Sequence, residues 1–187
     1  MTTTSILRRT ALLAALAAVL AGSARAQARF EQSLSISGGL YAASGFGNNF
    51  YTSARYDYFI PGTRWFIDGS LGVGSLTSNV IGSVTKAQIF TSNNLVTYEF
   101  AAAFDYAPGG AMPFLLFGVG GVREGEETHF AAVIGIGKRI PLPGLLGSNA
   151  LGFRYDIRDQ IFSQVINNSN PFVVHNITAT LGLQIYF

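Results

Sequence analysis

The sequence predicts an all-β protein, an eight-stranded antiparallel up-and-down barrel that crosses a membrane. Three observations support this: apolar and polar residues alternate along eight segments, proline and glycine cluster between those segments, and the chain begins with an export pattern. Beyond the N-terminal region, no apolar run is long enough for a spanning helix. Only helices and closed sheets satisfy every backbone polar group in lipid, so the alternating segments indicate a barrel.

The composition is apolar for a chain of 187 residues, with 49% hydrophobic and 12% charged residues. The absence of cysteine excludes a disulfide framework and a thiolate metal site. The formal charge of +2 includes Arg8, Arg9 and Arg25, which lie in the expected leader. Removing these three of the 12 basic residues leaves 9 against 10 acidic residues, a net charge of −1. No basic patch remains, and we expect no nucleic-acid partner.

The first 26 residues have the organisation of a secretory signal peptide. A positive segment is followed by the apolar run 11–21 and by Ala24-Arg25-Ala26, a small-x-small cleavage pattern. We expect cleavage after Ala26, or after Ala28, where the same pattern fits. The alternative is a retained anchor, but the run is shorter than the ~20 residues that a spanning helix needs. The expected regions are a cleaved signal peptide, 1–26, and an outer-membrane barrel domain, 27–187.

Alternation with a period of two defines the strands. Leu116 blurs the fifth segment, and segment 130–140 is apolar or glycine at both parities, so its register stays open. Most segments approach the ~9–11 residues of a tilted membrane strand. The eight segments cover 33–40, 52–60, 65–74, 96–105, 115–120, 130–140, 151–158 and 176–187.

Proline cannot donate to a strand ladder and therefore indicates where strands end. It predicts three short periplasmic turns, at Pro61-Gly62, at 108–113 and at 141–144, with both termini on the same side. The other four connections should be longer outer loops, as in outer-membrane barrels. These loops are 45–49, 77–94, 123–128 and 159–171.

Aromatic residues near the predicted strand ends should form two girdles at the membrane boundaries. The alternative is core packing in a soluble sandwich, which the signal peptide and the continuous apolar outer face disfavour. The expected inner girdle is Tyr58, Trp65, Tyr106, Tyr186 and Phe187, and the outer one is Phe46, Phe50, Phe90, Phe162 and Phe172.

Eight charged residues alternate with the lipid-facing positions and should point into the barrel. An eight-stranded barrel has an interior just wide enough for side chains to fill, and a lone buried charge is costly, so we expect ion pairs there. This favours a salt-bridged plug over a gated ion path, although inward glycine and alanine could leave room for water. The residues are Arg55, Asp57, Asp68, Glu99, Asp105, Arg154, Asp156 and Arg158.

The last residues, 180–187, resemble the C-terminal assembly signal of outer-membrane barrels, with Leu183, Ile185 and the final Phe187 at its apolar positions. Residues 151–159 and His175-Asn-Ile-Thr178 resemble the last hairpin of the small eight-stranded family that includes the OmpA membrane domain and OmpW. The resemblance implies a monomer in a Gram-negative outer membrane. Its implied partners are lipid or lipopolysaccharide and the barrel-assembly machinery. The OmpA peptidoglycan-binding domain is not matched, so wall anchoring is not implied.

Two sets of residues could carry chemistry. In the first, His175 should face outward near the outer rim, where Ser163 or Ser169 could lie. A lipid A deacylase with the same barrel has Ser two residues after its His, and here that position is Ile177, or Ala131 after His129. We therefore expect no catalytic residue.

The second set is an acidic loop cluster of Glu124, Glu126, Glu127 and His129. It lacks calcium-loop spacing and is expected to be solvated, so we expect no metal ion and no cofactor.

The expected role is structural or surface-exposed, with the outer loops as the interaction surface. The alternatives are a narrow channel, or an OmpW-like passage for small molecules, and, with least support, a lipid-modifying enzyme. Fold alone does not decide among them.

Overall fold

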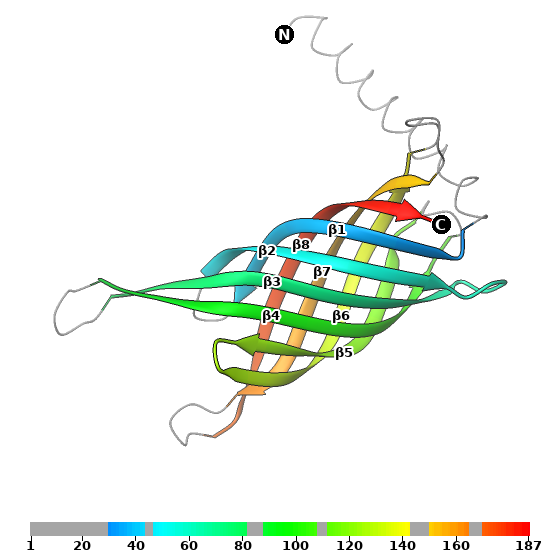
Figure 1. The fold of residues 1–187 in the computed structure, drawn as a ribbon. Helices are drawn as coiled ribbons and strands as arrows, with labels where there is room; N and C mark the ends of the chain where they lie inside the picture. Colours follow the sequence, from blue (N-terminus) through cyan, green and yellow to red (C-terminus); the bar gives the residue numbers. More distant parts are fainter. Residues whose placement is uncertain (1–29, 44–46, 82–87, 108–111, 143–149, 165–169) are drawn as a thin grey trace, which may run out of the picture.

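The computed structural model is a closed barrel in which each strand pairs antiparallel with the next and β8 returns to β1 (Figure 1). It describes residues 30–43, 47–81, 88–107, 112–142, 150–164 and 170–187. The eight strands are β1 (Gln32–Ala43), β2 (Gly47–Phe59), β3 (Trp65–Ile81), β4 (Gln88–Asp105), β5 (Phe114–Glu124), β6 (Glu127–Pro141), β7 (Leu151–Gln164) and β8 (Phe172–Tyr186). The predicted fold class is confirmed. The expected signal peptide, 1–26, lies outside the described residues.

No helix among the described residues is long and apolar enough to cross a membrane.

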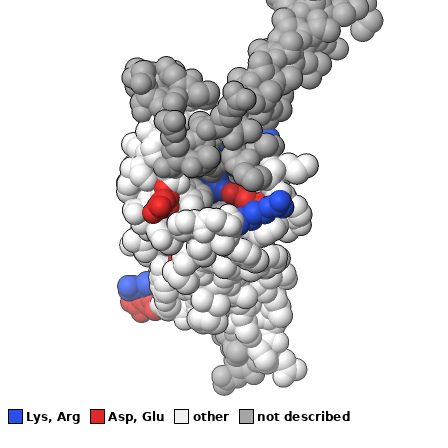
Figure 2. All heavy atoms as spheres, turned by 90° about the vertical axis from the view of Figure 1, so that its right-hand side faces the viewer, with Lys and Arg blue, Asp and Glu red and all other residues white. Residues whose placement is uncertain are grey.

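Alternation along each strand separates a polar interior from an apolar exterior. On β1, Ser35 is 2% exposed and its neighbour Ile36 is 70% exposed. Outward apolar positions on β8 run from Ile177 to Phe187. With about 3.3 Å per residue and a tilt of about 45°, this run is roughly 23 Å tall, close to the apolar band of outer-membrane barrels. Most of the described surface seen from the inner end is likewise uncharged (Figure 2).

The register of segment 130–140, open from the sequence, is set by pairing on both sides of β6. Val133 lies opposite Gly118 of β5 and Gln160 of β7, and its side chain is buried. Ile134 and Ile136 therefore face outward, and Arg139 faces inward. The inward glycine at 137 allows a close approach, because a Cβ there would collide with the Phe114 ring.

The Pro61-Gly62 turn is confirmed. Thr63 donates its backbone N–H to Ile60 O at 3.2 Å, and Gly62 has φ of 73°. Proline at the second position and a left-handed glycine at the third define a type II turn. Of the other two predicted inner turns, Pro113 directly precedes β5 and Pro141 ends β6, whereas 108–111 and 143–149 lie outside the described residues.

The predicted outer loop over 77–94 is wrong, because strands fill most of it. β3 and β4 stay paired out to Ile81 and Gln88. Pairing of β2 with β3 ends at Gly74, and pairing of β4 with β5 ends at Leu95. Residues 75–81 and 88–94 therefore form a two-stranded ribbon, here called the outer ribbon, that extends beyond the barrel (Figure 1). Its serine and asparagine content suggested a loop, but its Thr, Val, Ile and Phe residues favour strands.

The other outer loops are shorter than predicted, because the strands that flank them extend into the predicted loop residues. β7 continues to Gln164 and β8 begins at Phe172. β5 and β6 are joined by Gly125 and Glu126, with Gly125 at φ of 66°, as two-residue hairpins require. β2 already begins at Gly47, and residues 44–46 lie outside the described part.

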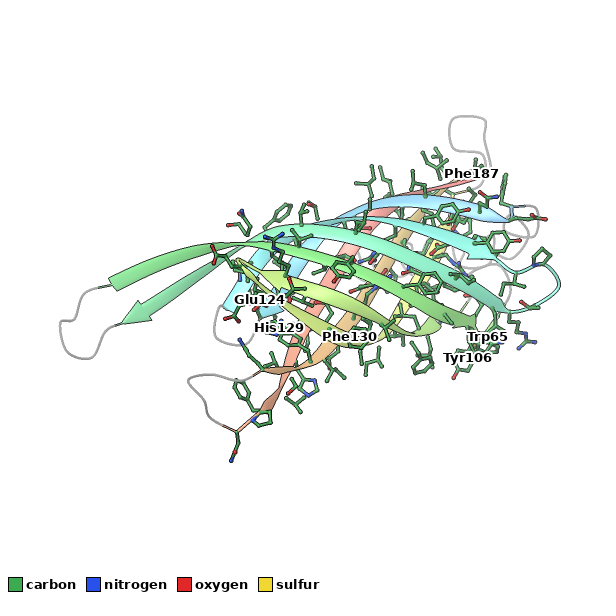
Figure 3. The ribbon with its side chains drawn as sticks, turned by 60° about the horizontal axis from the view of Figure 1, so that its bottom comes forward. Trp65, Tyr106, Glu124, His129, Phe130 and Phe187 are labelled. Atoms are coloured by element: carbon green, nitrogen blue, oxygen red, sulfur yellow. The ribbon has the colours of Figure 1, made fainter. Side chains whose placement is uncertain are left out.

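The girdle prediction is wrong for two residues. Phe162 is 4% exposed and Tyr186 is 2% exposed, because they share parity with inward Gln160 and Gln184. The inner girdle instead includes Phe104, whose ring lies 5.1 Å from Trp65 and 5.6 Å from Tyr106 (Figure 3). Phe46 and the side chain of Phe90 fall outside the described part. The remaining predicted rings are exposed: Tyr58, Trp65, Tyr106 and Phe187 at the inner end, and Phe50 and Phe172 at the outer end.

Candidate functional site: the barrel interior

The structure places all eight predicted interior charges inside the barrel, each at most 8% exposed. They face the lumen because every strand turns alternate residues inward, and they come from four strands. β2 supplies Arg55 and Asp57, β3 supplies Asp68, β4 supplies Glu99 and Asp105, and β7 supplies Arg154, Asp156 and Arg158.

Arg154 lies at the centre of the charges, with no exposed side-chain surface. Its Nη1 donates to Asp57 at 2.7 and 2.8 Å, and its Nη2 donates to Asp68 at 2.7 Å. Its Nε donates to Asp156 at 2.9 Å. All three guanidinium nitrogens are therefore bound to carboxylates, and one side chain ties β7 to β2 and β3 across the lumen.

Arg158 shares two of these carboxylates. Its Nη1 and Nη2 donate to Asp68 at 3.0 and 3.1 Å, and its Nε donates to Asp156 at 3.0 Å. It also pairs with Glu99, and Arg55 pairs with Asp156. Charge-assisted, multidentate bonds of this kind are the strong class of protein hydrogen bonds.

Neutral side chains complete the charged layer. Gln184 donates to Asp57 at 2.9 Å and to Ser33 at 2.7 Å, and Ser33 donates to Asp57 at 3.0 Å. Glu99 accepts from Ser70 at 3.0 Å and from Gln160. In this described network, three guanidinium groups face four carboxylates, so these neutral donors help to hold the excess negative charge. Sequence reasoning assigned neither glutamine to the network, although Gln160 has the parity of Arg154 and Arg158 on β7. Gln184 has the parity of inward Thr180 on β8, a strand without Asp, Glu, Lys or Arg.

Asp105 is not paired within this network. Its ion pair is with Arg139, which has no exposed side-chain surface. The Arg139 guanidinium lies 4.5 Å from the Phe59 ring centre, 4.2 Å from Phe66 and 5.4 Å from Phe114, so aromatic rings surround the cation. The inward position of Arg139 was not predicted, because the apolar and glycine residues of β6 do not show which parity faces the lumen.

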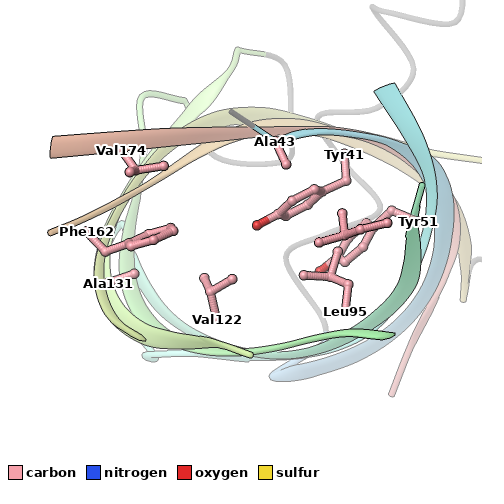
Figure 4. Packing of buried hydrophobic residues seen from close by; sticks show 9 residues of the cluster. Tyr41, Ala43, Tyr51, Leu95, Val122, Ala131, Phe162 and Val174 are labelled. Atoms are coloured by element: carbon pink, nitrogen blue, oxygen red, sulfur yellow. The ribbon is translucent and has the colours of Figure 1, made fainter. Parts of the chain in front are cut away.

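Apolar layers lie on either side of the charged layer. In the outer layer, side chains from several strands point into the lumen (Figure 4). The inner layer contains Phe66, Phe114 and Leu116, with Phe59 packed against it. The outer layer consists of Tyr41, Ala43, Tyr51, Leu76, Leu95, Val122, Ala131, Phe162 and Val174.

A few polar bonds cross the outer layer. The hydroxyl of Tyr51 lies 2.7 Å from Thr97 Oγ1, and it occupies the place that a Cβ at Gly72 would take. Asn176 donates to Tyr41 at 2.8 Å and to Glu124 at 3.0 Å. The layer therefore combines apolar packing with satisfied polar groups.

The predicted acidic cluster is split between the lumen and the surface. Glu124 reaches inward to Asn176, and His129 stacks on Phe162 with ring centres 4.8 Å apart. Glu126 is exposed, and the Glu127 side chain is 71% exposed with Oε2 3.5 Å from His129 Nε2. Within the described ranges, no three His, Asp or Glu residues are placed to hold a metal ion.

His175 faces outward, as predicted, and its Nδ1 lies 2.8 Å from Asp159 Oδ2. Ser163 lies opposite Val173 in the β7–β8 register, one outward position above the His175 row, and no hydroxyl contact to His175 is present among the described residues. Ser169 lies outside the described part. A histidine–carboxylate pair alone lacks the nucleophile that acyl transfer requires.

The predicted assembly signal lies on the outer face of β8. Leu183, Ile185 and Phe187 are 60%, 51% and 55% exposed. Phe187 also closes the barrel, since its N–H donates to Gln32 O at 3.0 Å and its carbonyl accepts from Gln32 N at 3.1 Å.

No family model and no curated protein matches the chain. Among solved structures, Neisserial surface protein A is similar with a TM-score of 0.54 and 12% identity, over 84% of this chain and 97% of that one. The N-terminal barrel domain of Pseudomonas aeruginosa OprF has a TM-score of 0.48 and 14% identity, over 85% and 100%. A major outer membrane protein of Thermus thermophilus has a TM-score of 0.45 and 15% identity, over 85% and 100%. By fold, the chain is a small eight-stranded β-barrel of the kind that outer-membrane proteins form.

Proposed function

We propose that this protein is a structural, surface-exposed barrel of the bacterial outer membrane, with an interior closed to ions and solutes and with its outer hairpins as the interaction surface. The closed sheet and apolar exterior support a place in lipid, since no other arrangement of strands satisfies the backbone there. The fold shared with Neisserial surface protein A supports a surface location. No catalytic role is proposed.

The observation that carries the closed interior is its three-layer filling. Arg154 and Arg158 bridge the lumen with no exposed side-chain surface. Apolar side chains fill the barrel above and below them. An ion crossing this interior would have to break several buried ion pairs and pass two apolar layers, each of which costs desolvation.

The test is ion and solute leakage from liposomes that carry the refolded mature chain, with folding verified by the gel shift between heated and unheated samples. The proposal expects leakage equal to that of empty liposomes. Arg154→Ala and Glu99→Ala each remove a member of the charged layer, so leakage through either variant would show that this layer blocks the lumen. Arg64→Ala, at an exposed turn where Nη1 lies 3.4 Å from Tyr106 O, is the matched control. The closed-interior proposal is wrong if the wild-type chain conducts ions and if Arg154→Ala or Glu99→Ala, but not Arg64→Ala, changes the conductance. The protein would then be a channel.

A narrow channel, or a passage for small molecules, is the second candidate, and one observation favours it. Buried hydroxyls of Ser35, Ser37, Ser53 and Thr178 have no hydrogen-bond partner among the residues that the structure describes. They lie on β1, β2 and β8, so this wall of the lumen is polar and suited to water. This candidate would be favoured if water permeates through the barrel and if Ser37→Val and Ser53→Val reduce that permeation.

The outer ribbon supports the proposed interaction surface, because its two strands stay paired with each other beyond the points where their pairing with β2 and β5 ends. Since the chain has no cysteine, a single cysteine at Ser78 can be labelled specifically. Intact cells should expose this cysteine to a membrane-impermeant maleimide, whereas a cysteine at Thr63, in an inner turn, should stay unlabelled. The reverse pattern would invert the proposed orientation.

Assembly and lipid contacts belong to the same proposal. We expect the barrel-assembly machinery to read Leu183, Ile185 and Phe187, which are exposed on β8, and lipid or lipopolysaccharide to surround a monomer. Deletion of Phe187 should lower the amount of folded barrel in the outer membrane, and an unchanged amount would remove this part of the proposal.

A further inference from the structure

A groove of about 570 Å³ interrupts the apolar outer surface, with lining residues from β1 to β6. Gly69 and Ala54 line it with the exposed rings of Tyr56, Tyr98, Phe100 and Phe130. In the register, Gly69 lies between Tyr56 of β2 and Phe100 of β4. The groove therefore crosses the strands and follows the pairing direction.

Gly69 differs from the other outward-facing glycines of the described strands. A Cβ at Gly38 would touch the Phe50 ring at 3.7 Å, and a Cβ at Gly121 would collide with the Tyr98 ring. Aromatic side chains thus cover these two positions. At Gly69, no atom lies within 4 Å of a Cβ, although an aromatic residue stands on each side. The rings flank this glycine and leave the space above it open.

The outer end of the groove coincides with the outer limit of the apolar band. Tyr98 and Phe130 lie on either side of Gly121. The next outward positions are Val96, Arg123 and Thr128, of which Arg123 and Thr128 are polar and exposed. At the opposite end, the Tyr56 hydroxyl donates to Gln32 at 2.8 Å, so its polar atom is satisfied outside the groove. The groove is apolar along its length and opens where lipid headgroups begin.

We propose that this groove binds one acyl chain of a lipid in the outer leaflet. The groove lies between two rows of outward side chains, one with Tyr56, Gly69 and Phe100 and one with Ala54, Leu71 and Tyr98. The two rows are about 6.7 Å apart along each strand, so the groove holds one polymethylene chain where it passes Gly69. Within a bilayer the gain is not hydrophobic, because the chain leaves other lipid. The gain comes from dispersion contacts with walls that would otherwise face a void. A flexible acyl chain fits this narrow space better than a protein surface does.

The inference rests on the proposed place in a membrane, and the experiment separates the two. The mature chain is refolded in vesicles of phosphatidylethanolamine and phosphatidylglycerol that contain a phosphatidylethanolamine with a photoactivatable diazirine in mid-chain. Lipid adducts are then mapped by mass spectrometry. Adducts anywhere on the outer face establish membrane insertion. Adducts concentrated on Tyr56, Tyr98 and Phe100 establish the groove, and an even distribution over the outer face overturns it.

Gly69→Leu is the decisive variant, because a Cβ at Gly69 meets no atom within 4 Å and the rest of the side chain would occupy the groove. It should lower adducts at the groove by about fivefold, which corresponds to about 1 kcal/mol of lost contacts. Gly38→Leu places the same side chain elsewhere on the outer face, against Phe50, and should leave groove adducts unchanged. Equal adducts in wild type and Gly69→Leu overturn the proposal, as do crosslinks at the groove to a second copy of the chain. If Gly69→Leu does not fold, the wild-type adduct map decides.

Discussion

The two groups of buried charge are stabilised in different ways. In the charged layer between the two apolar layers, here called the central layer, Arg154 donates from all three guanidinium nitrogens to carboxylates. In the inner layer, Arg139 pairs with Asp105, and three aromatic rings surround its guanidinium. Its Nε and Nη1 have no hydrogen-bond partner in the described part of the chain. The central layer therefore depends on hydrogen-bonded ion pairs, and the inner layer depends on packing around a cation. Removing a charge should cost much more in the first than in the second.

Arg154→Met should have the largest effect, because it leaves Asp57, Asp68 and Asp156 short of a shared partner inside the lumen. Breaking a buried ion pair in this way costs about 3–5 kcal/mol. Denaturant unfolding in lipid vesicles, followed by gel shift, measures the loss in the free energy of unfolding. Arg64→Ala is the surface control and should change it by less than about 0.5 kcal/mol. A loss in Arg154→Met as small as that of the control would show that the central pairs are not structural.

Gln184→Leu should have an intermediate effect. The side chain is fully buried, donates to Asp57 and Ser33, and accepts from Tyr186 at 3.1 Å. Leucine keeps most of the volume but removes three hydrogen bonds, because Tyr186 loses its acceptor and Asp57 and Ser33 each lose one donor. This loss costs about 2 kcal/mol. The same unfolding measurement checks it. If Gln184→Leu were neutral, the neutral donors would not be needed to complete the charged layer.

Arg139→Met should have the smallest effect of the three, about 1 kcal/mol, which is the size of a cation–π contribution. Methionine keeps the packing among the rings, and the Asp105 side chain, 12% exposed, can be reached by solvent. The variant Arg139→Met with Asp105→Asn should be close to Arg139→Met alone. A loss as large as that of Arg154→Met would mean that the two layers are stabilised in the same way.

Strand positions and facing directions follow from the sequence, because a period of two is a local property. The partners of each charge do not. Arg55 pairs with Asp156, 101 positions away, and Arg154 donates to Asp68, 86 positions away, since closure of the sheet brings β7 opposite β2 and β3 across the lumen. Arg139 escaped prediction because the residues around it are apolar or glycine at both parities. The outer ribbon was not predicted because its polar residues indicated a loop. Two strands can pair through their backbones without burying their side chains, so the polar composition does not exclude a ribbon.

The order of the charges along the chain has a consequence for when the barrel can form. Synthesis delivers Asp57, Asp68 and Glu99 well before Arg154 and Arg158, which arrive on the seventh strand. An unfinished chain therefore carries carboxylates with too few cationic partners, and moving them into lipid at that stage is costly. For a barrel that lies in lipid as proposed above, most of these carboxylates find their cationic partners only when the seventh strand arrives, which ties their burial to a nearly complete chain.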